Sequence, residues 1–103
     1  MGNYRESKIE ATLTAGGSVT VELDPDLSFR TTTVVTSGNT TGTITLTKKV
    51  VGATRYTAFE PAATLDLSLY DERIIEGMAL SGLTLTHDGT GADINLTIVQ
   101  YAD

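Results

Sequence analysis

The chain has 103 residues, a formal net charge of −6, one histidine and no cysteine. Without cysteine it can form no disulfide framework, thiolate zinc site or cysteine nucleophile. The acidic balance disfavours a nucleic-acid-binding surface, which needs clustered Lys and Arg. No apolar run approaches the ~18 residues of a membrane-spanning helix, and residues 1–8 lack the apolar stretch of a secretory signal. The length indicates one domain with one modest core.

Apolar and polar residues alternate over most of the chain, which is the period of a strand with one buried face. Clusters of Gly, Pro, Asn and Asp interrupt this alternation and predict turns. The strands expected from it are residues 9–13, 19–23, 27–36, 43–47, 56–59, 64–69, 80–87 and 94–101.

The pattern also predicts how some strands are joined. Ala15-Gly16-Gly17 predicts a hairpin between the first two strands, and residues 83–98 are expected to form a closing hairpin. The last strand is long and apolar, which indicates a central position in a sheet. Asp71-Glu72-Arg73 can begin a helical turn that Gly77 limits to one or two turns. The side chains expected to face inward include Leu27, Phe29, Val35, Leu65, Leu67, Leu69, Leu83 and Leu85.

About eight strands without a long amphipathic helix predict an all-β fold, an antiparallel β-sandwich or jelly roll of about eight strands, with a small barrel as the alternative. Residues 1–8 are expected to form a flexible N-terminal arm, and residues 9–103 a single β-sandwich domain. The chain has nineteen threonines. Many alternate with Ile, Leu and Val, so we expect them on the outer faces of the sheets.

The candidate catalytic and metal sites are few. His87 is the only imidazole and adjoins the turn at Asp88-Gly89. A general base needs a partner within hydrogen-bond reach, and the sequence points to none, so we expect a structural histidine. The acidic loops Asp24-Pro25-Asp26 and 88–93 carry oxygen ligands of the kind Ca²⁺ takes, but they lack the EF-hand spacing, and Asp also favours turns. We therefore predict no catalytic residue, no cofactor and no metal.

Two charged segments stand out. Residues 71–76 hold Asp71, Glu72, Arg73 and Glu76, and we expect a solvated turn or an intersubunit ion pair there rather than paired catalytic carboxylates. The other segment is the only basic concentration of the chain. It is too small for nucleic-acid binding, so it indicates solvation of a hairpin or pairing with an acidic neighbour in an assembly. Its members are Lys48, Lys49 and Arg55.

Carbohydrate binding is a separate possibility, because small sandwiches can present flat aromatic rings to sugars. The chain has no Trp, and its four tyrosines are scattered along the sequence. They are Tyr4, Tyr56, Tyr70 and Tyr101.

The order of elements resembles the small all-β virion proteins of tailed bacteriophages, which include capsid decoration (cement) proteins and tail-associated sandwiches. The resemblance covers about residues 9–101. It implies a non-enzymatic structural protein without cofactors that forms symmetric oligomers, often trimers, on a capsid lattice. The segments that carry it are a polar N-terminal stretch, then Gly42–Thr47, Tyr56–Phe59, Ile74–Gly77 and the stretch from Leu83 to Ile98.

The functional hypothesis is a capsid decoration protein of the phage head, located in the virion after synthesis in the host cytoplasm. Its expected partner is the major capsid protein or another virion protein, and a homotrimer is the favoured oligomer. Neither nucleic acid nor membrane is an expected partner. The alternatives are a tail or tail-fibre-associated module, a carbohydrate-binding or adhesion sandwich, and a small hydrolase. The predicted partner-binding residues are Tyr4, Arg5, Glu6 and Lys8.

Overall fold

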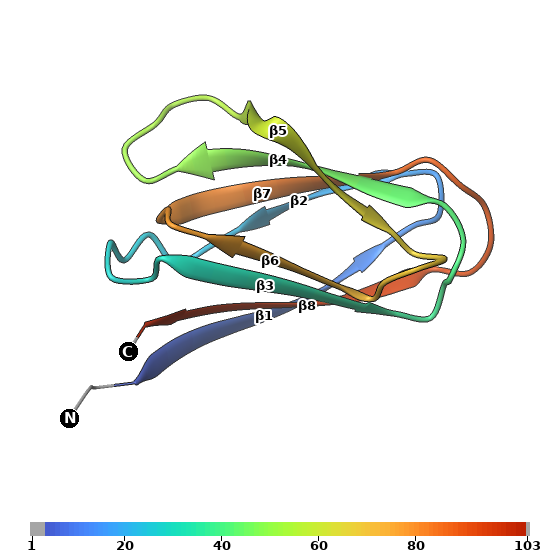
Figure 1. The fold of residues 1–103 in the computed structure, drawn as a ribbon, viewed down its shortest axis with the longest axis horizontal. Coiled ribbons are helices and arrows are strands. Elements are labelled where there is room, and N and C mark those ends of the chain that lie inside the picture. Colours follow the sequence, from blue (N-terminus) through green and yellow to red (C-terminus); the bar gives the residue numbers. More distant parts are fainter. Residues whose placement is uncertain (1–3, 103) are drawn as a thin grey trace.

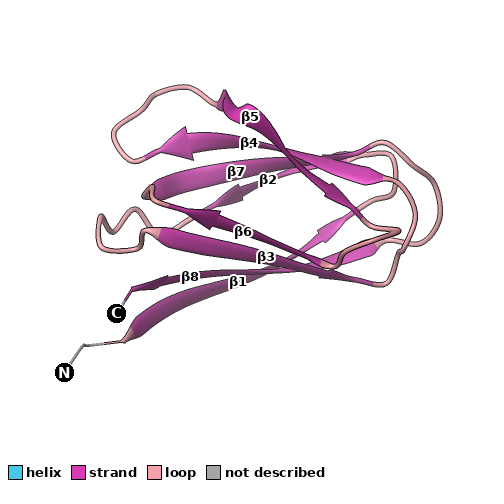
Figure 2. Cartoon of the chain, in the orientation of Figure 1, coloured by secondary structure: helices cyan, strands magenta, loops and turns pink. Residues whose placement is uncertain are grey.

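Two four-stranded antiparallel sheets pack face to face in a computed structural model that describes residues 4–102 (Figure 1). Strands and connecting loops make up this part of the chain (Figure 2). It contains no helix long and apolar enough to cross a membrane. The strands are β1 (Arg5–Leu13), β2 (Ser18–Glu22), β3 (Thr31–Ser37), β4 (Thr43–Val50), β5 (Thr57–Asp66), β6 (Glu72–Glu76), β7 (Leu80–His87) and β8 (Ile94–Ala102).

The strand order shows how the chain closes the sandwich. The first sheet has the order β1-β8-β3-β6, and the second sheet has the order β2-β7-β4-β5. Only the β4–β5 connection joins neighbours in one sheet, so each of the other connections crosses between the sheets. The predicted all-β antiparallel sandwich of about eight strands is confirmed, as is the central position of the last strand, because β8 lies between β1 and β3.

Every strand contributes its inward-facing residues to a single core between the two sheets. The alternation of burial along β8, for example, buries Ile94, Leu96 and Ile98 and leaves the residues between them on the outer face. The expected burial of Phe29, Leu65, Leu67, Leu83 and Leu85 is confirmed. Two threonines depart from the expected outer positions, because Thr32 and Thr36 on β3 face the core.

Both predicted hairpins are wrong. β1 pairs with β8 and β2 pairs with β7, so the turn at Gly16-Gly17 carries the chain from one sheet to the other. β7 and β8 likewise lie in different sheets. The reason is that alternation identifies a buried face, and two strands on opposite sides of one core show the same alternation as two paired strands.

The predicted boundary at residue 9 is also wrong, because β1 begins at Arg5. Residues 5–8 pair with β8 in register, with Arg5 opposite Ala102 and Lys8 opposite Val99. This end of the strand is polar on both faces, so it lacks the apolar marks by which the sequence signals a strand. Residues 1–3 of the predicted arm lie outside the described residues.

Three predicted side-chain orientations differ in the structure. Leu27 is 68% exposed in the loop before β3, and Val35 is 38% exposed because Val34, its neighbour, faces the core. Leu69 is 69% exposed in the loop after β5. It follows a turn in which the Asp66 carboxylate accepts hydrogen bonds from the Ser68 backbone N–H and hydroxyl. Leu27 and Leu69 lie outside the strands, where the alternation of apolar and polar residues has ended. Val35 lies on β3 where two apolar residues follow each other, so only one of them can face the core.

The two least regular segments form strands. Residues 57–66 form one strand, β5, that runs through a cis Glu60-Pro61 peptide and a shift of register against β4. The expected helical turn after Asp71 is instead β6, which pairs with β3. The β-branched pair Ile74-Ile75 favours a strand, because Ile75 enters the core while Ile74 faces outward.

The core position of β8 makes a direct prediction for stability. Ile98→Ala removes a fully buried side chain between the sheets, and we expect it to lower the free energy of unfolding by about 2–4 kcal/mol. Thr97→Ala, one residue away on the outer face, is the matched control and should cost at most about 1 kcal/mol. Urea unfolding measures both, and equal losses would contradict the assignment of the two faces.

Candidate functional site

The outer face of the first sheet gathers side chains from all four of its strands. The pairing register aligns them in three rows across β1, β8, β3 and β6, and we call this surface the rimmed face. The rows are Glu6-Tyr101-Thr31-Glu76, Lys8-Val99-Thr33-Ile74 and Glu10-Thr97-Val35-Glu72.

Apolar side chains alternate with three threonines across the centre of the rimmed face, and two of the apolar side chains are open to solvent. Ile74 is 48% exposed and Val35 is partly exposed as described above, with Val99 and Tyr101 half-buried beside them. The outer face of the second sheet differs, because hydroxyl groups occupy most of its positions on β2, β7 and β4. They pair across strands, as in the 2.9 Å contact between Thr20 and Thr84. Apolar side chains on an outer sheet face are typical of a protein–protein contact.

The margins of the rimmed face carry negative charge. Glu6 and Glu10 lie on β1, and Glu72 and Glu76 lie on β6, so carboxylates border the apolar centre on both sides. Lys8 is the only cation among the twelve residues. Within residues 4–102 the one ion pair joins Arg5 to Asp26, so none of these four glutamates is neutralised by an ion pair inside the described chain.

Three of the four predicted partner-binding residues lie on or beside the rimmed face. Glu6 and Lys8 belong to it, and the exposed Tyr4 places its ring 6.3 Å from that of Tyr101. Arg5 is separate and binds the loop before β3. The residues from β8, β3 and β6 were missed because the sequence does not reveal which strands are neighbours. One signal was present in the apolar pairs Val34-Val35 and Ile74-Ile75, because a strand with one buried face turns one member of each pair outward.

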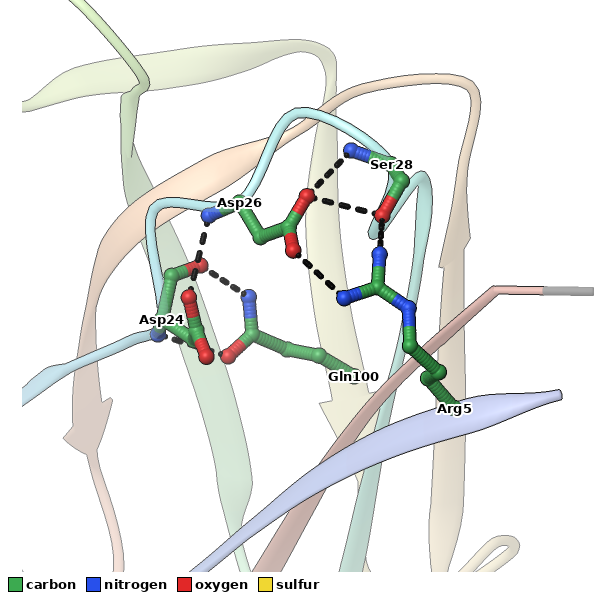
Figure 3. A network of polar contacts seen from close by, with 5 residues as sticks. All are labelled: Arg5, Asp24, Asp26, Ser28 and Gln100. Atoms are coloured by element: carbon green, nitrogen blue, oxygen red, sulfur yellow. Dashed lines mark hydrogen bonds and ion pairs between the residues drawn. The ribbon is translucent and has the colours of Figure 1, made fainter. Parts of the chain in front are cut away.

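Arg5 organises the loop between β2 and β3 (Figure 3). Its Nη1 donates to Asp26 Oδ2 at 2.9 Å, and its Nη2 donates to the Ser28 hydroxyl. The Asp26 carboxylate also accepts from the Ser28 backbone N–H at 2.9 Å and from its hydroxyl at 2.7 Å. The two bonds from Ser28, followed by the one from Arg5, lower the pKa of Asp26 from 3.8 to about 2.

Gln100 holds the start of the same loop from inside the core (Figure 3). Its Oε1 accepts from the Asp24 N–H at 2.8 Å, and its Nε2 donates to the Asp24 carbonyl at 2.9 Å. At the other end of the molecule, Asp88 Oδ1 accepts from the Thr43 N–H at 2.7 Å. The acidic loops thus hold backbone groups, and residues 4–102 contain no cluster of three or more His, Cys, Asp or Glu suited to a metal.

His87 lies in the core at the opposite end of the sandwich from Gln100 and is 1% exposed. Its Nδ1 accepts from the Gly16 N–H at 2.9 Å, so the ring proton belongs on Nε2, which donates to the Thr41 carbonyl at 2.6 Å. The ring thereby joins the β1–β2 and β3–β4 turns. Gly42, at φ +83°, is required beside it, because a Cβ there would meet Nε2 at 2.5 Å.

A groove of about 410 Å³ separates the outer strands β5 and β6. Phe59, Ala63 and Met78 line it together with Lys48 and Arg73. Lys48 Nζ lies 5.2 Å from the centre of the Phe59 ring and donates to the Ala58 carbonyl at 3.2 Å. The ammonium group of Lys48 therefore already contacts the groove wall. The lining contains two carboxylates, those of Glu60 and Glu76, and no imidazole or hydroxyl side chain.

Three of the seven basic residues of the chain lie around the end of β4. Lys48 and Lys49 precede Val50, the last residue of the strand, and Arg55 and Tyr56 follow in the turn before β5. Lys49 Nζ lies 5.5 Å from the centre of the Tyr56 ring. We call Lys49, Arg55 and Tyr56 the basic turn. Lys48 precedes Lys49 on β4, so its side chain points to the opposite face and lies in the groove. The basic turn presents an aromatic ring accompanied by two cations.

No protein-family model matches the chain, and neither does any curated protein. Among solved structures, AlgX of Pseudomonas aeruginosa is similar, with 12% identity and a TM-score of 0.60 over 93% of this chain, which spans only 26% of that protein. The SPBc2 prophage-derived protein YomS is similar over 95% of this chain and 96% of its own, with 13% identity and a TM-score of 0.50. At these identities the likeness shows the fold.

The position of His87 predicts a structural effect. His87→Ala leaves the Gly16 N–H and the Thr41 carbonyl without their partner and opens a cavity, so we expect the free energy of unfolding to fall by about 2–4 kcal/mol. Thr90→Ala changes an exposed side chain in the adjoining loop and should cost under about 0.5 kcal/mol. Urea unfolding distinguishes them, and a harmless His87→Ala would contradict this role.

The lowered pKa of Asp26 predicts a pH dependence. The ionised carboxylate stabilises the native state above the ordinary pKa of 3.8, and this contribution is lost as the pH falls toward about 2. Asp26→Asn should therefore destabilise the protein at pH 7, and its difference from the wild type should shrink between pH 3.8 and about 2.

Urea unfolding at both ends of that range, together with NMR titration of the Asp26 carboxyl group, measures this effect. Ser28→Ala is the companion variant, because it removes one of the stabilising hydrogen bonds and should raise the pKa of Asp26. A wild-type Asp26 that titrates at its ordinary pKa would contradict the hydrogen-bond arrangement.

Proposed function

We propose that the chain is a structural virion protein, a capsid decoration protein that binds the phage head and stabilises it. The observation that carries the proposal is the rimmed face, where partly exposed Val35 and Ile74 lie on the outside of a sheet. Soluble monomers seldom gather apolar side chains on such a surface without a partner. A decoration protein stabilises a particle by burying surface across the junctions of its subunits.

The topology supports the same proposal. We assign the sheets β1-β8-β3-β6 and β2-β7-β4-β5 to a jelly roll, because sheet-crossing connections join eight antiparallel strands into two sheets. Jelly rolls occur in viral capsid proteins and in lectins. The similar prophage-derived protein has nearly the same extent as this chain, so there too a sandwich of this kind makes up almost the whole of the solved chain.

The chemistry of the described residues favours a non-enzymatic role. The imidazole of His87 is enclosed and bonded through both nitrogens. The groove between β5 and β6 has no hydroxyl or imidazole in its lining, and its carboxylates, Glu60 and Glu76, belong to exposed residues. We propose the major capsid protein as the binding partner and a homotrimer as the assembled form. The proposed location is the virion.

Immunogold electron microscopy of phage particles released from the host tests this function. An antibody raised against the purified chain should label the surface of the heads, because a decoration protein lies on the outside of the capsid. Particles from a host in which the gene is deleted provide the control. Label confined to tails would overturn the decoration role in favour of a tail-associated module, and unlabelled particles would overturn the virion role altogether.

A further inference from the structure

We infer that the rimmed face binds the basic turn of a second copy of this chain, so that copies assemble head to tail. The inference rests on the proposed function, in which the protein acts as an oligomer, and it names the contact that builds the oligomer. It follows from the chemistry of two surfaces that the fold places apart.

The two surfaces are complementary in charge and in their apolar parts. The rimmed face has four carboxylates and one ammonium around Val35, Ile74 and Val99. The basic turn has two cations, and Lys49 lies against the partly exposed ring of Tyr56. Tyr and Arg are enriched at the centres of protein interfaces. An aromatic ring bordered by cations therefore fits an apolar centre bordered by carboxylates.

The rimmed face does not suit a symmetric contact with its own copy. A two-fold contact brings the same patch together from both subunits, which would place Glu6 and Glu10 of each copy against the carboxylates of the other. Like charges facing each other across an interface cost several kcal/mol. The basic turn is excluded as its own partner for the same reason. Only a contact between the rimmed face and the basic turn places opposite charges against each other.

The two surfaces lie on opposite sides of the molecule. In Figure 1 the turn between β4 and β5 is at the top of the view, and β1 and β8 are at the bottom. One chain therefore cannot satisfy its own rimmed face. A contact between two different surfaces generates a ring if the rotation closes and an open filament if it does not.

The contact is modest in size. With strands about 4.8 Å apart and about 3.3 Å of rise per residue, three strand spacings and four residues give about 14 Å by 13 Å between the outer Cα atoms. This area of about 180 Å² is well below the roughly 800 Å² per partner of a standard interface, so we expect the contact to be weak. Much of the attraction comes from exposed charges, which salt screens over about 10 Å at 0.1 M. We therefore expect an association that depends on salt and protein concentration.

Sedimentation velocity of the purified full chain tests the contact through two charge reversals. Glu72→Lys alters the rimmed face and Lys49→Glu alters the basic turn. Each should weaken association at least tenfold at about 50 mM salt relative to the wild type. Asp93→Lys makes the same change of charge as Glu72→Lys in the exposed β7–β8 loop, outside both surfaces, and should associate like the wild type. Urea unfolding midpoints confirm that each variant folds.

Mixing the two variants gives the decisive result. The Glu72→Lys chain keeps an intact basic turn, and the Lys49→Glu chain keeps an intact rimmed face, so an equimolar mixture should form dimers that neither forms alone. The chain with both reversals should recover self-association, because the exchanged charges again attract.

A wild type that stays monomeric at low salt would overturn the inference, as would a Glu72→Lys chain that associates normally or a mixture that stays monomeric. These outcomes are independent of where the antibody labels the particle. Labelled heads with a monomeric purified chain would reject the head-to-tail contact and leave the decoration role standing. A head-to-tail oligomer with unlabelled particles would do the opposite.

Discussion

The structure depends on how the chain crosses between two sheets at each end of one core. All connections but β4–β5 cross in this way, so the backbone in these loops leaves the ladders and needs other hydrogen-bond partners. Two buried polar side chains on the last two strands supply them. Gln100 on β8 bonds both backbone groups of Asp24 at one end, and His87 on β7 bonds Gly16 and Thr41 at the other.

These side chains tie the beginning of the chain to its end. β8 is the last strand in the sequence, and it lies inside the first sheet, between β1 and β3. Pairings between residues so far apart in sequence carry a large loop-closure cost, which local contacts do not offset. Arg5 adds a third such link, from the first residue of β1 to the loop at Asp26. The polar start of β1 thus serves both the sheet and the loop.

The sequence predicts strand positions well because each strand has one face in the same core, and alternation records that burial. It does not predict strand partners. Gly16-Gly17 marks a turn in either topology, and only tertiary packing decides whether that turn joins neighbours or crosses between sheets. β1 and β6 were misjudged for a related reason: Glu6, Lys8, Glu72 and Glu76 face outward on strands with few apolar residues, so the local pattern is weak.

The same misjudged strands explain why the candidate surface was only partly foreseen. The sequence predicts that Tyr4, Glu6 and Lys8 belong to an arm. The fold instead makes Glu6 and Lys8 the margin of a sheet face whose central strands are β8 and β3. Strands at the edges of a sheet commonly carry charges because these discourage unwanted pairing with other chains. On β1 and β6 these charges also surround an apolar centre. A single feature of the sequence therefore both protects the open edges from aggregation and limits the partners that the exposed face accepts.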